Sequence, residues 1–240
     1  MCMTGAYFFG GTMKKQNPFK DLSSFELILC ILSLTIVTAS YLLTPSKDYL
    51  SLIASLIGVT ALIFVSKGYV IGQVLTVVFA VFYGIISFYF KYYGEMITYL
   101  FMTSPIAILS VISWIKHPYK DTAEVAVNKM SKKQIVTMLS LATITTVIFF
   151  FILNAIGNEN IIFSTLSITT SFVASYLTFM RSPYYALAYA LNDIVLIVLW
   201  ALATVADVKY LPMIICFVMF LLNDAYGYYN WKKIQKRQQD

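Results

Sequence analysis

The chain has 240 residues, of which 60% are hydrophobic and only 12% are charged, and its mean hydropathy is +0.78. Soluble domains are about 25% charged, so this composition excludes a soluble globular domain and predicts a membrane protein surrounded by lipid. The formal net charge of +6 comes from cations in short groups between apolar runs, which indicates membrane topology rather than nucleic-acid binding.

Eight apolar segments are long enough to cross a bilayer as helices, which takes about 17–25 residues each. They span 27–43, 49–66, 69–90, 96–115, 135–156, 161–180, 184–204 and 210–229. The roughly ten-residue alternation of an outer-membrane β-barrel is not visible. The predicted fold class is therefore an all-α integral membrane protein with eight transmembrane helices. Segment 27–43 is the weakest of the eight, because it is short and contains four Ser and Thr residues.

The distribution of positive charge supports the count of eight. If every segment spans, 14 of the 17 Lys and Arg residues lie on one side, together with both termini. Loops rich in Lys and Arg are cytoplasmic, so we predict a cytoplasmic tail over 1–26, a cytoplasmic loop over 116–134 and a cytoplasmic tail over 232–240. A seven-span alternative that moves the N-terminal tail outside gives a weaker division of 11 to 6.

Two blocks of three helices, 49–115 and 161–231, resemble each other. In each block the first helix ends in one basic residue, and the third helix ends in Trp followed by Lys. The single segment 135–156 between them is a linker helix that gives both blocks the same orientation. We therefore predict parallel repeats with a substrate bound near mid-membrane between them, and segment 27–43 becomes an extra N-terminal helix. The alternative is the ordinary likeness between any two helical triplets.

The dipeptide Asn-Asp occurs twice inside the apolar segments, and we predict that it marks a ligand site. Charged side chains are costly in a bilayer, and these aspartates are the only carboxylates that we place deep in the membrane. Asn offers a donor and an acceptor to a carboxamide or a ribose, and aromatic faces attract a cationic ring. The predicted substrate-binding residues are Asn192, Asn223, Asp193, Asp224, Tyr185, Tyr189, Trp200 and Tyr99. The alternative is that the Asn and Asp side chains only hold helices together by hydrogen bonds.

Other polar and aromatic residues have less distinctive positions. Gln73 faces either the transport pathway or the headgroups, and Pro105 should kink the helix that contains it. Trp114 and Trp231 stand at helix ends, where Trp usually anchors a helix at the membrane interface. Glu95 is expected in an outer loop. None of these positions defines a function by itself.

Metal and nucleophile chemistry is not expected. The chain has three Cys and one His, in no metal-ligand spacing. It contains no Walker-type phosphate-binding loop and no HExxH or Ser/His/Asp arrangement. We therefore predict a transporter rather than an enzyme, with no metal and no cofactor.

Three stretches of the sequence resemble the PnuC family of bacterial nicotinamide riboside (nicotinamide mononucleotide) transporters. They are KYYGEMITYLFMTSPIAILSVISWIKHPYK, RSPYYALAYALNDIVLIVLW and FLLNDAYGYYNWKK. The resemblance covers 49–233 and implies the three-plus-one-plus-three helix fold of SWEET sugar transporters. It implies facilitated diffusion of nicotinamide riboside across the bacterial inner membrane, homotrimers, and ligand hydrogen bonds from Asn192 and Asn223. The family's W-x-x-W motif before the first asparagine is replaced here by the run from Tyr185 to Ala188.

Three alternatives remain open at this point. Relatives in the same superfamily resemble carriers of thiamine or riboflavin, so another aromatic vitamin is an alternative substrate. Asp193 and Asp224 would serve a proton-coupled carrier, although no basic partner lies inside the membrane. A membrane scaffold or sensor without transport would use the 116–134 loop to hold a partner.

Overall fold

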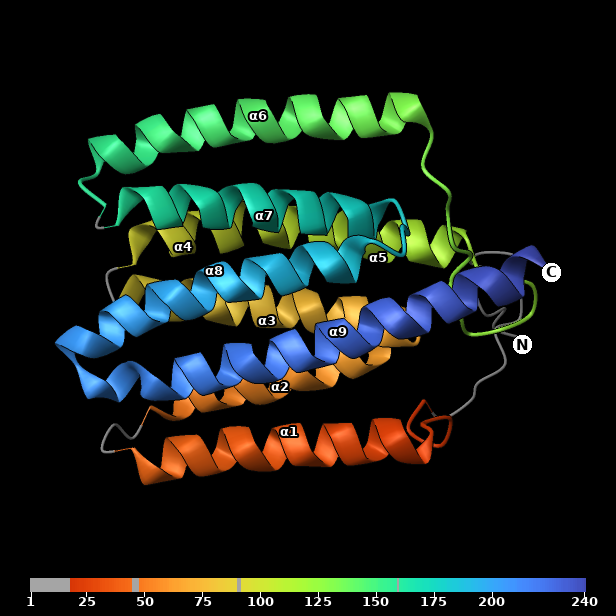
Figure 1. The fold of residues 1–240 in the computed structure, drawn as a ribbon, viewed down its shortest axis with the longest axis horizontal. Coiled ribbons are helices and arrows are strands. Elements are labelled where there is room, and N and C mark those ends of the chain that lie inside the picture. Colours follow the sequence, from red (N-terminus) through yellow and green to blue (C-terminus); the bar gives the residue numbers. More distant parts are fainter. Residues whose placement is uncertain (1–17, 45–47, 90–91, 159) are drawn as a thin grey trace, which may run out of the picture.

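The structure is a computed structural model that describes residues 18–44, 48–89, 92–158 and 160–240, and within these ranges the chain is helical with only isolated β-bridges (Figure 1). The α-helices are α1 (Ser24–Leu43), α2 (Tyr49–Ser66), α3 (Val70–Tyr89), α4 (Tyr93–Ile97), α5 (Ser104–Lys116), α6 (Lys132–Ala155), α7 (Ile161–Phe179), α8 (Tyr185–Ala206) and α9 (Leu211–Gln239). A π-helix (Thr98–Thr103) joins α4 to α5, and a 3-10 helix (Val208–Tyr210) leads into α9. Within the described ranges, eight helical spans are long and apolar enough to cross a membrane, which confirms the predicted fold class.

Helix α1 begins three residues before the predicted segment because its first turn is capped. The backbone N–H of Glu26 donates to Ser23 Oγ at 3.3 Å, and the backbone N–H of Ser23 donates to Glu26 Oε2 at 2.7 Å. Such a capping box pairs two backbone donors that the start of a helix leaves free. Glu26 was expected in the cytoplasmic tail over 1–26, and that placement is wrong, because its side chain closes the first turn of a membrane helix and is buried.

A π-helical turn lies directly before Pro105 in the span formed by α4, the π-helix and α5. Proline has no N–H to donate, and its ring clashes with the carbonyl four residues earlier. The wider turn changes the bonding pattern, because the backbone N–H and the side-chain hydroxyl of Ser104 both donate to the carbonyl of Tyr99. The predicted disturbance of the helix at Pro105 takes the form of this turn. π-Helical turns are frequent at functional sites, and Tyr99 lies in this one.

The helices form two triplets that pack so that the third helix of each contacts the first helix of the other. Helices α2, α3 and α4–α5 form the first triplet, and α7, α8 and α9 form the second; α9 packs against α2, and α5 packs against α7. Helix α6 lies at one edge against α7, and α1 lies at the opposite edge against α2 and α9 (Figure 1). The contact between the triplets is therefore made by helices that come from both predicted blocks.

Two tryptophans show how the triplets are joined. Trp114 and Trp231 are fully buried, with ring centroids 5.4 Å apart. Trp231 Nε1 donates to the carbonyl of Val65 at 2.8 Å, and Trp114 Nε1 donates to the carbonyl of Thr178 at 3.0 Å. The expectation that these residues anchor helices at the membrane interface is wrong, because both N–H groups have buried partners inside the protein.

The residues next to the tryptophans repeat the same exchange. Asn230 Nδ2 donates to the carbonyl of Ser66 at 2.8 Å, and Ser113 Oγ donates to the carbonyl of Phe179 at 3.0 Å. In each case the end of a third helix donates to the last carbonyls of a first helix in the other triplet. The contacts are thus reciprocal, as a two-fold relation between the triplets requires.

Helix α9 continues to Gln239, so residues 232–240, predicted as a tail, are largely helical. Lys, Gln and Arg are good helix formers, and no Gly or Pro interrupts the run. Gln238 fixes the end of the helix, because its side chain accepts from the backbone N–H of Val127 at 2.8 Å and donates to the carbonyl of Val125 at 3.1 Å. The loop before α6 therefore packs on the end of α9.

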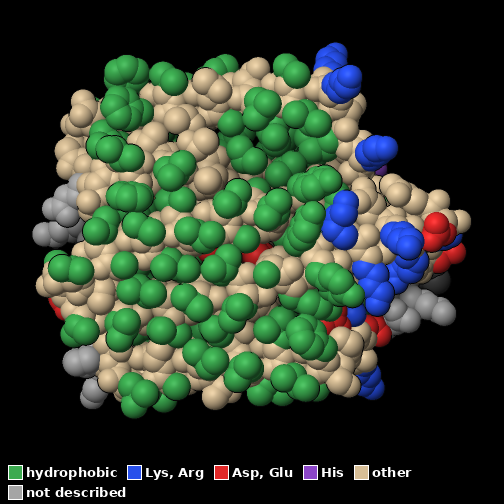
Figure 2. Space-filling model, in the orientation of Figure 1, with side chains coloured by type: hydrophobic (Ala, Val, Ile, Leu, Met, Phe, Trp, Pro, Cys, Tyr) green, Lys and Arg blue, Asp and Glu red, His purple; other side chains and the backbone are tan. Residues whose placement is uncertain are grey.

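Positive charge gathers at one end of the molecule, which we call the basic end. Figure 2 shows Lys and Arg side chains at this end and hydrophobic side chains over most of the same face. The described cations of the basic end are Lys20, Lys67, Lys116, Lys120, Lys129, Lys132, Lys133, Arg181, Lys232, Lys233, Lys236 and Arg237. Lys209 lies at the opposite end, and Lys14, Lys15, Lys47 and Lys91 lie outside the described residues.

Candidate substrate-binding site

A cavity between the two triplets collects most of the polar residues predicted to bind a ligand. The volume of this cavity is about 50 Å³. The cavity is therefore narrow, and side chains must shift before a nucleoside-sized molecule enters. Its polar and aromatic lining includes Gln73, Tyr99, Ser171, Tyr185, Tyr189, Asn192, Asp193 and Asp224.

Asn192 is held in place from α7. Its Oδ1 accepts from the hydroxyls of Thr170 at 2.8 Å and Ser171 at 2.9 Å, and its side chain also contacts the hydroxyl of Tyr99. Two donors on the oxygen fix the orientation of the amide, so the NH₂ group is the part of the side chain that points away from α7. Asn192 is thus a buried and oriented hydrogen-bonding group at the wall of the cavity.

The two predicted aspartates meet in this cavity. The carboxyl groups of Asp193 on α8 and Asp224 on α9 lie next to each other, and both residues are about 3% exposed. Asp193 Oδ2 is buried without a hydrogen-bond partner among the described residues. Burying an unpaired carboxylate is costly, so this oxygen indicates a place where a donor or a cation of the ligand would be stabilised.

Three tyrosines give the cavity aromatic walls. Tyr185 and Tyr189 lie one helical turn apart on α8, and the hydroxyls of Tyr189 and Ser175 are 3.2 Å apart. The Tyr185 hydroxyl lies over Gly227, where a Cβ atom would be 3.3 Å from it. Because Gly227 has no side chain, the Tyr185 ring can approach α9 closely at this point. Tyr99 lines the cavity from the π-helix.

Asn223, the second predicted asparagine, does not line the cavity. Its Nδ2 donates to Ser33 Oγ on α1 at 3.0 Å and to the carbonyl of Met219 at 2.7 Å. Adjacent residues of an α-helix point about 100° apart, since the helix has 3.6 residues per turn. Asp224 faces the cavity, so Asn223 faces the extra N-terminal helix. The polar residue Ser33 in that helix was the signal in the sequence.

Trp200 also lies away from the cavity. Its Nε1 donates to the hydroxyl of Tyr83 at 3.0 Å, and its ring packs against Tyr92 and Tyr210 at the end opposite the basic end. The sequence left open whether Gln73 faces the transport pathway or the headgroups. In the structure Gln73 is buried and lines the cavity.

Glu95 is the residue that sequence reasoning missed. It was expected in an outer loop, but it lies in the first turn of α4 and is buried, where it accepts from Ser167 Oγ at 3.2 Å. The helix begins at Tyr93, three residues before the predicted segment. The placement of Glu95 in a loop was therefore wrong.

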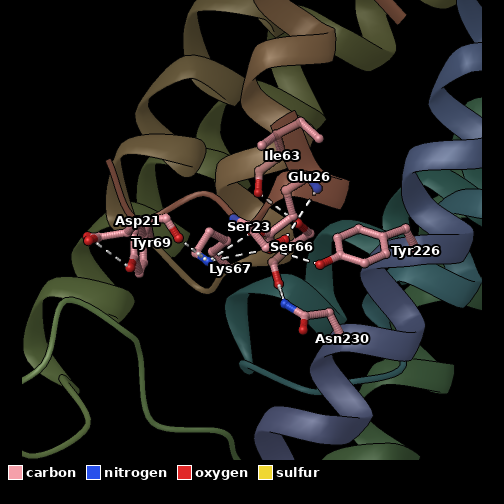
Figure 3. A network of polar contacts seen from close by, with 9 residues as sticks. All are labelled: Asp21, Ser23, Glu26, Ile63, Ser66, Lys67, Tyr69, Tyr226 and Asn230. Carbon is pink, nitrogen blue, oxygen red and sulfur yellow. Dashed lines mark hydrogen bonds and ion pairs between the residues drawn. The ribbon is translucent and has the colours of Figure 1, made fainter. Parts of the chain in front are cut away.

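A polar network joins several segments at the basic end (Figure 3). Glu26 on α1 pairs with Lys67 Nζ at 3.1 Å and accepts from the hydroxyl of Tyr226 on α9 at 2.8 Å. Lys67 Nζ also donates to the carbonyl of Asp21 at 2.8 Å. Figure 3 shows these side chains converging from three segments on Glu26. Helices α1 and α9 and the α2–α3 connection are thus tied together at this end.

Tyr69 extends this network outside the membrane-spanning helices. Its hydroxyl donates to Asp21 Oδ2 at 3.4 Å. Burial, followed by the nearby Asp21 carboxylate, raises the pKa of Tyr69 to about 12. Tyr69 therefore remains a neutral hydrogen-bond donor at physiological pH.

Comparison with known proteins agrees with this architecture. The family model described as "Nicotinamide mononucleotide transporter" matches residues 48–233. Proteins named "Nicotinamide riboside transporter PnuC" from Neisseria mucosa and Haemophilus influenzae are each 26% identical to this chain; the alignments cover 93% of this chain in both cases, and 86% and 96% of the relatives. A crystal structure titled as that of the vitamin B3 transporter PnuC has a TM-score of 0.78, with 26% identity over 90% of this chain and 94% of that one. The predicted family is confirmed: the chain belongs to the nicotinamide mononucleotide transporter family, together with the PnuC proteins.

Proposed function

We propose that this protein carries nicotinamide riboside across the bacterial plasma membrane by facilitated diffusion with alternating access. The family model, the names of the two relatives and the similar crystal structure support this substrate. Nothing in the described residues forms a group of His, Cys, Asp and Glu that could hold a metal ion.

The observation that carries the proposal is the composition of the cavity between the triplets. Nicotinamide riboside has a planar pyridinium with a fixed positive charge, a carboxamide and a ribose. The adjacent carboxyls of Asp193 and Asp224 offer a counter-charge, and tyrosine rings attract a cationic ring. The oriented NH₂ group of Asn192 offers a donor to an oxygen of the ligand. Tyr99, Tyr185 and Tyr189 supply the apolar walls that such a ring needs.

The mechanism that we propose is rocking of the two triplets about this cavity, as parallel repeats permit. The reciprocal contacts of Trp114 and Trp231 support the repeat, because each third helix holds the end of a first helix in the other triplet. These contacts join the two triplets at the basic end, where the Glu26–Lys67 pair also ties α1 to the first triplet. Opening towards the basic end would have to separate them.

For orientation, we propose that the basic end faces the cytoplasm, which puts both termini inside the cell. The support is the concentration of Lys and Arg at that end, since cytoplasmic loops carry an excess of these residues. The resemblance to the family further predicts a homotrimer. Cysteine labelling with a membrane-impermeant reagent at the basic end, and cross-linking in intact membranes, would test the two statements.

The experiment that tests the function is uptake of labelled nicotinamide riboside into proteoliposomes. We expect saturable uptake by the wild-type protein, unaffected by a protonophore, and loss of uptake in Asn192→Ala and Asp193→Asn. Thr146→Val is the matched control, because Thr146 bonds Thr169 between α6 and α7, away from the cavity. Unchanged uptake in a folded Asn192→Ala protein would refute the site. Uptake that collapses with the protonophore would favour the proton-coupled carrier instead.

A further inference from the structure

A second, smaller cavity lies at the end of the molecule opposite the basic end. It is bordered by Tyr92, Glu95, Asn158, Asn160, Ser164 and Trp200, and its volume is only about 10 Å³, so side chains must shift before a ring enters. These residues come from the start of α4, the link between α6 and α7, the first turn of α7, and the later part of α8. We call it the outer cavity. None of its residues lines the central cavity.

The carboxylate of Glu95 is the unusual group in the outer cavity. Glu95 is 5% exposed, and its Oε1 accepts a hydrogen bond from Ser167 at 3.2 Å. Its Oε2 is buried without a hydrogen-bond partner, and no ion pair involves Glu95, within the described part of the chain. A buried carboxylate without a counter-charge is costly, and a cation in the outer cavity would remove that cost.

The walls of the outer cavity are suited to an organic cation rather than a metal ion. The ring centroids of Tyr92 and Trp200 are 5.0 Å apart with an angle of 62° between the ring planes, and the Tyr210 ring lies 6.1 Å from Tyr92 and 5.7 Å from Trp200. Aromatic faces stabilise cationic ligands, and tryptophan does so most strongly. The described residues place no further Asp or Glu beside Glu95 to complete a metal site.

Lys209, the described cation of this end, is already engaged. Its Nζ lies 2.7 Å from Asp207 Oδ2 and 4.9 Å from the centroid of the Tyr210 ring. The hydrogen bond from Lys209 holds the pKa of Asp207 below its usual range. The Lys209 charge is therefore balanced by Asp207, and it also shows that an ammonium group is accepted against this aromatic cluster.

Two tyrosines connect the outer cavity to the central one. Trp200 donates to the hydroxyl of Tyr83, and the rings of Tyr83 and Tyr99 are 4.3 Å apart. Tyr99 lines the central cavity, and it lies four residues after Glu95 on the same span. The pair Tyr83–Tyr99 therefore stands between the two cavities.

We propose that the outer cavity is a first binding site for an organic cation with a flat aromatic ring, held by the Glu95 carboxylate and the Tyr92 and Trp200 rings before it reaches the central cavity. This proposal rests on the proposed function for the identity of the cation that arrives there. Release of the Trp200–Tyr83 hydrogen bond is the movement that would admit the ring. Glu95 supplies the counter-charge, and Ser167 orients it.

The test uses a probe that has the cationic ring but no ribose, namely 1-methylnicotinamide, and the full-length protein in lipid nanodiscs. A pyridinium against an indole quenches its emission, so binding is measured as saturable quenching of tryptophan fluorescence. Trp114 and Trp231 are buried at the basic end. The substitution Trp200→Phe therefore shows which part of the quenching comes from the outer cavity. Neutral nicotinamide is the control for the charge.

We expect saturable quenching in the wild type, loss of it in Trp200→Phe, and an affinity reduced about tenfold or more in Glu95→Gln, because this substitution removes the counter-charge of the ring. Glutamine keeps an oxygen for Ser167, so the fold should survive. Ser167→Ala removes the hydrogen bond but keeps the charge, and should retain most of the affinity. Asp193→Asn, in the central cavity, should keep the quenching while it loses uptake.

Several results would overturn the outer site. They are unchanged affinity in Glu95→Gln, equal quenching by neutral nicotinamide, or no saturable quenching in a wild-type protein that transports nicotinamide riboside. The last result would leave the proposed function standing. Conversely, charge-dependent quenching at Trp200 in a protein that transports no nicotinamide riboside would support the outer site and refute the proposed function.

Discussion

The two ends of the molecule each bury one glutamate near the start of a helix, and the two residues differ in how their oxygens are paired. Glu26 at the basic end has Lys67 as its counter-charge, accepts from Tyr226, and closes a capping box with Ser23. Glu95 at the opposite end has the hydroxyl of Ser167 on one oxygen, and its other oxygen is unpaired among the described residues.

This difference separates a carboxylate that stabilises the fold from one that is available to a ligand. A buried charge that is paired and hydrogen-bonded is tolerated, whereas one without a counter-charge lowers stability. An ionisable side chain of the second kind, inside a membrane protein, indicates a functional site. We therefore expect mutations at the two ends to have opposite effects on stability.

Removal of Lys67 should have the largest effect on stability. In Lys67→Ala the carboxylate of Glu26 stays buried without its counter-charge, and we expect a loss of about 3 kcal/mol, the low end of the range for breaking a buried pair, because Lys67 is partly exposed. Thermal unfolding in detergent, followed by size-exclusion chromatography, measures it. The exposed Lys129 gives the matched control Lys129→Ala. If Lys67→Ala unfolds at the same temperature as Lys129→Ala, the ion pair does not stabilise this end.

The sequence was sufficient for the properties that depend on composition along the chain. Eight spans follow from apolar length, and the basic end follows from the positions of Lys and Arg. Asn192 and Asp193 could be placed in a cavity because the bilayer makes buried polar residues rare. The family could be identified from helix order together with the Asn-containing segments.

The properties that the sequence did not predict depend on the rotation and the exact start of helices. Asn223 stands beside Asp224, but the helical rotation between neighbours turns it towards Ser33. Glu95 lies in a helix rather than in a loop, because α4 starts at Tyr93, earlier than hydropathy indicates. The position of Trp231 near a helix end is typical of an interface anchor. Only the structure shows that its N–H donates to the buried carbonyl of Val65. Such contacts join segments far apart in the chain, so no local pattern contains them.

The double variant Lys67→Ala/Glu26→Gln should be more stable than Lys67→Ala alone. Glu26→Gln by itself should cost about 1.5 kcal/mol, because it replaces hydrogen bonds to a charged group by weaker neutral ones. In the double variant no unpaired charge remains, so the two effects should be far from additive, with a coupling of about 1–3 kcal/mol. The same unfolding assay measures the cycle. Simple additivity would mean that Glu26 and Lys67 act independently.

Glu95→Gln should change stability less, and in the opposite direction. Without ligand we expect it to unfold at the same temperature as the wild type or slightly above, a gain of up to about 1 kcal/mol, since an unpaired buried carboxyl becomes a neutral amide. The comparison with Glu26→Gln in the same preparation is the control, because the chemical change is identical. Equal destabilisation of both variants would show that Glu95 is a structural residue like Glu26.

Asn223→Ala should have the smallest effect. Three residues of α1, spaced by about two turns, make polar contacts inside the protein: Glu26 with Tyr226, Ser33 with Asn223, and Tyr41 with Ser55. Hydrogen bonds between membrane helices contribute about 0.6 kcal/mol on average. Removing one of the three should therefore lower the unfolding temperature slightly and leave α1 attached by the other two.

Uptake by Asn223→Ala, measured together with its stability, tests whether Asn223 belongs to the substrate-binding site. Asn223→Ala should transport nicotinamide riboside at close to the wild-type rate, whereas Asn192→Ala should lose transport although both substitutions remove the same amide. If Asn223→Ala also abolishes uptake in a folded protein, the side chain must turn from Ser33 into the cavity during transport. In that case α1 would be a moving part of the carrier, because the bond that Asn223 gives up is its bond to α1.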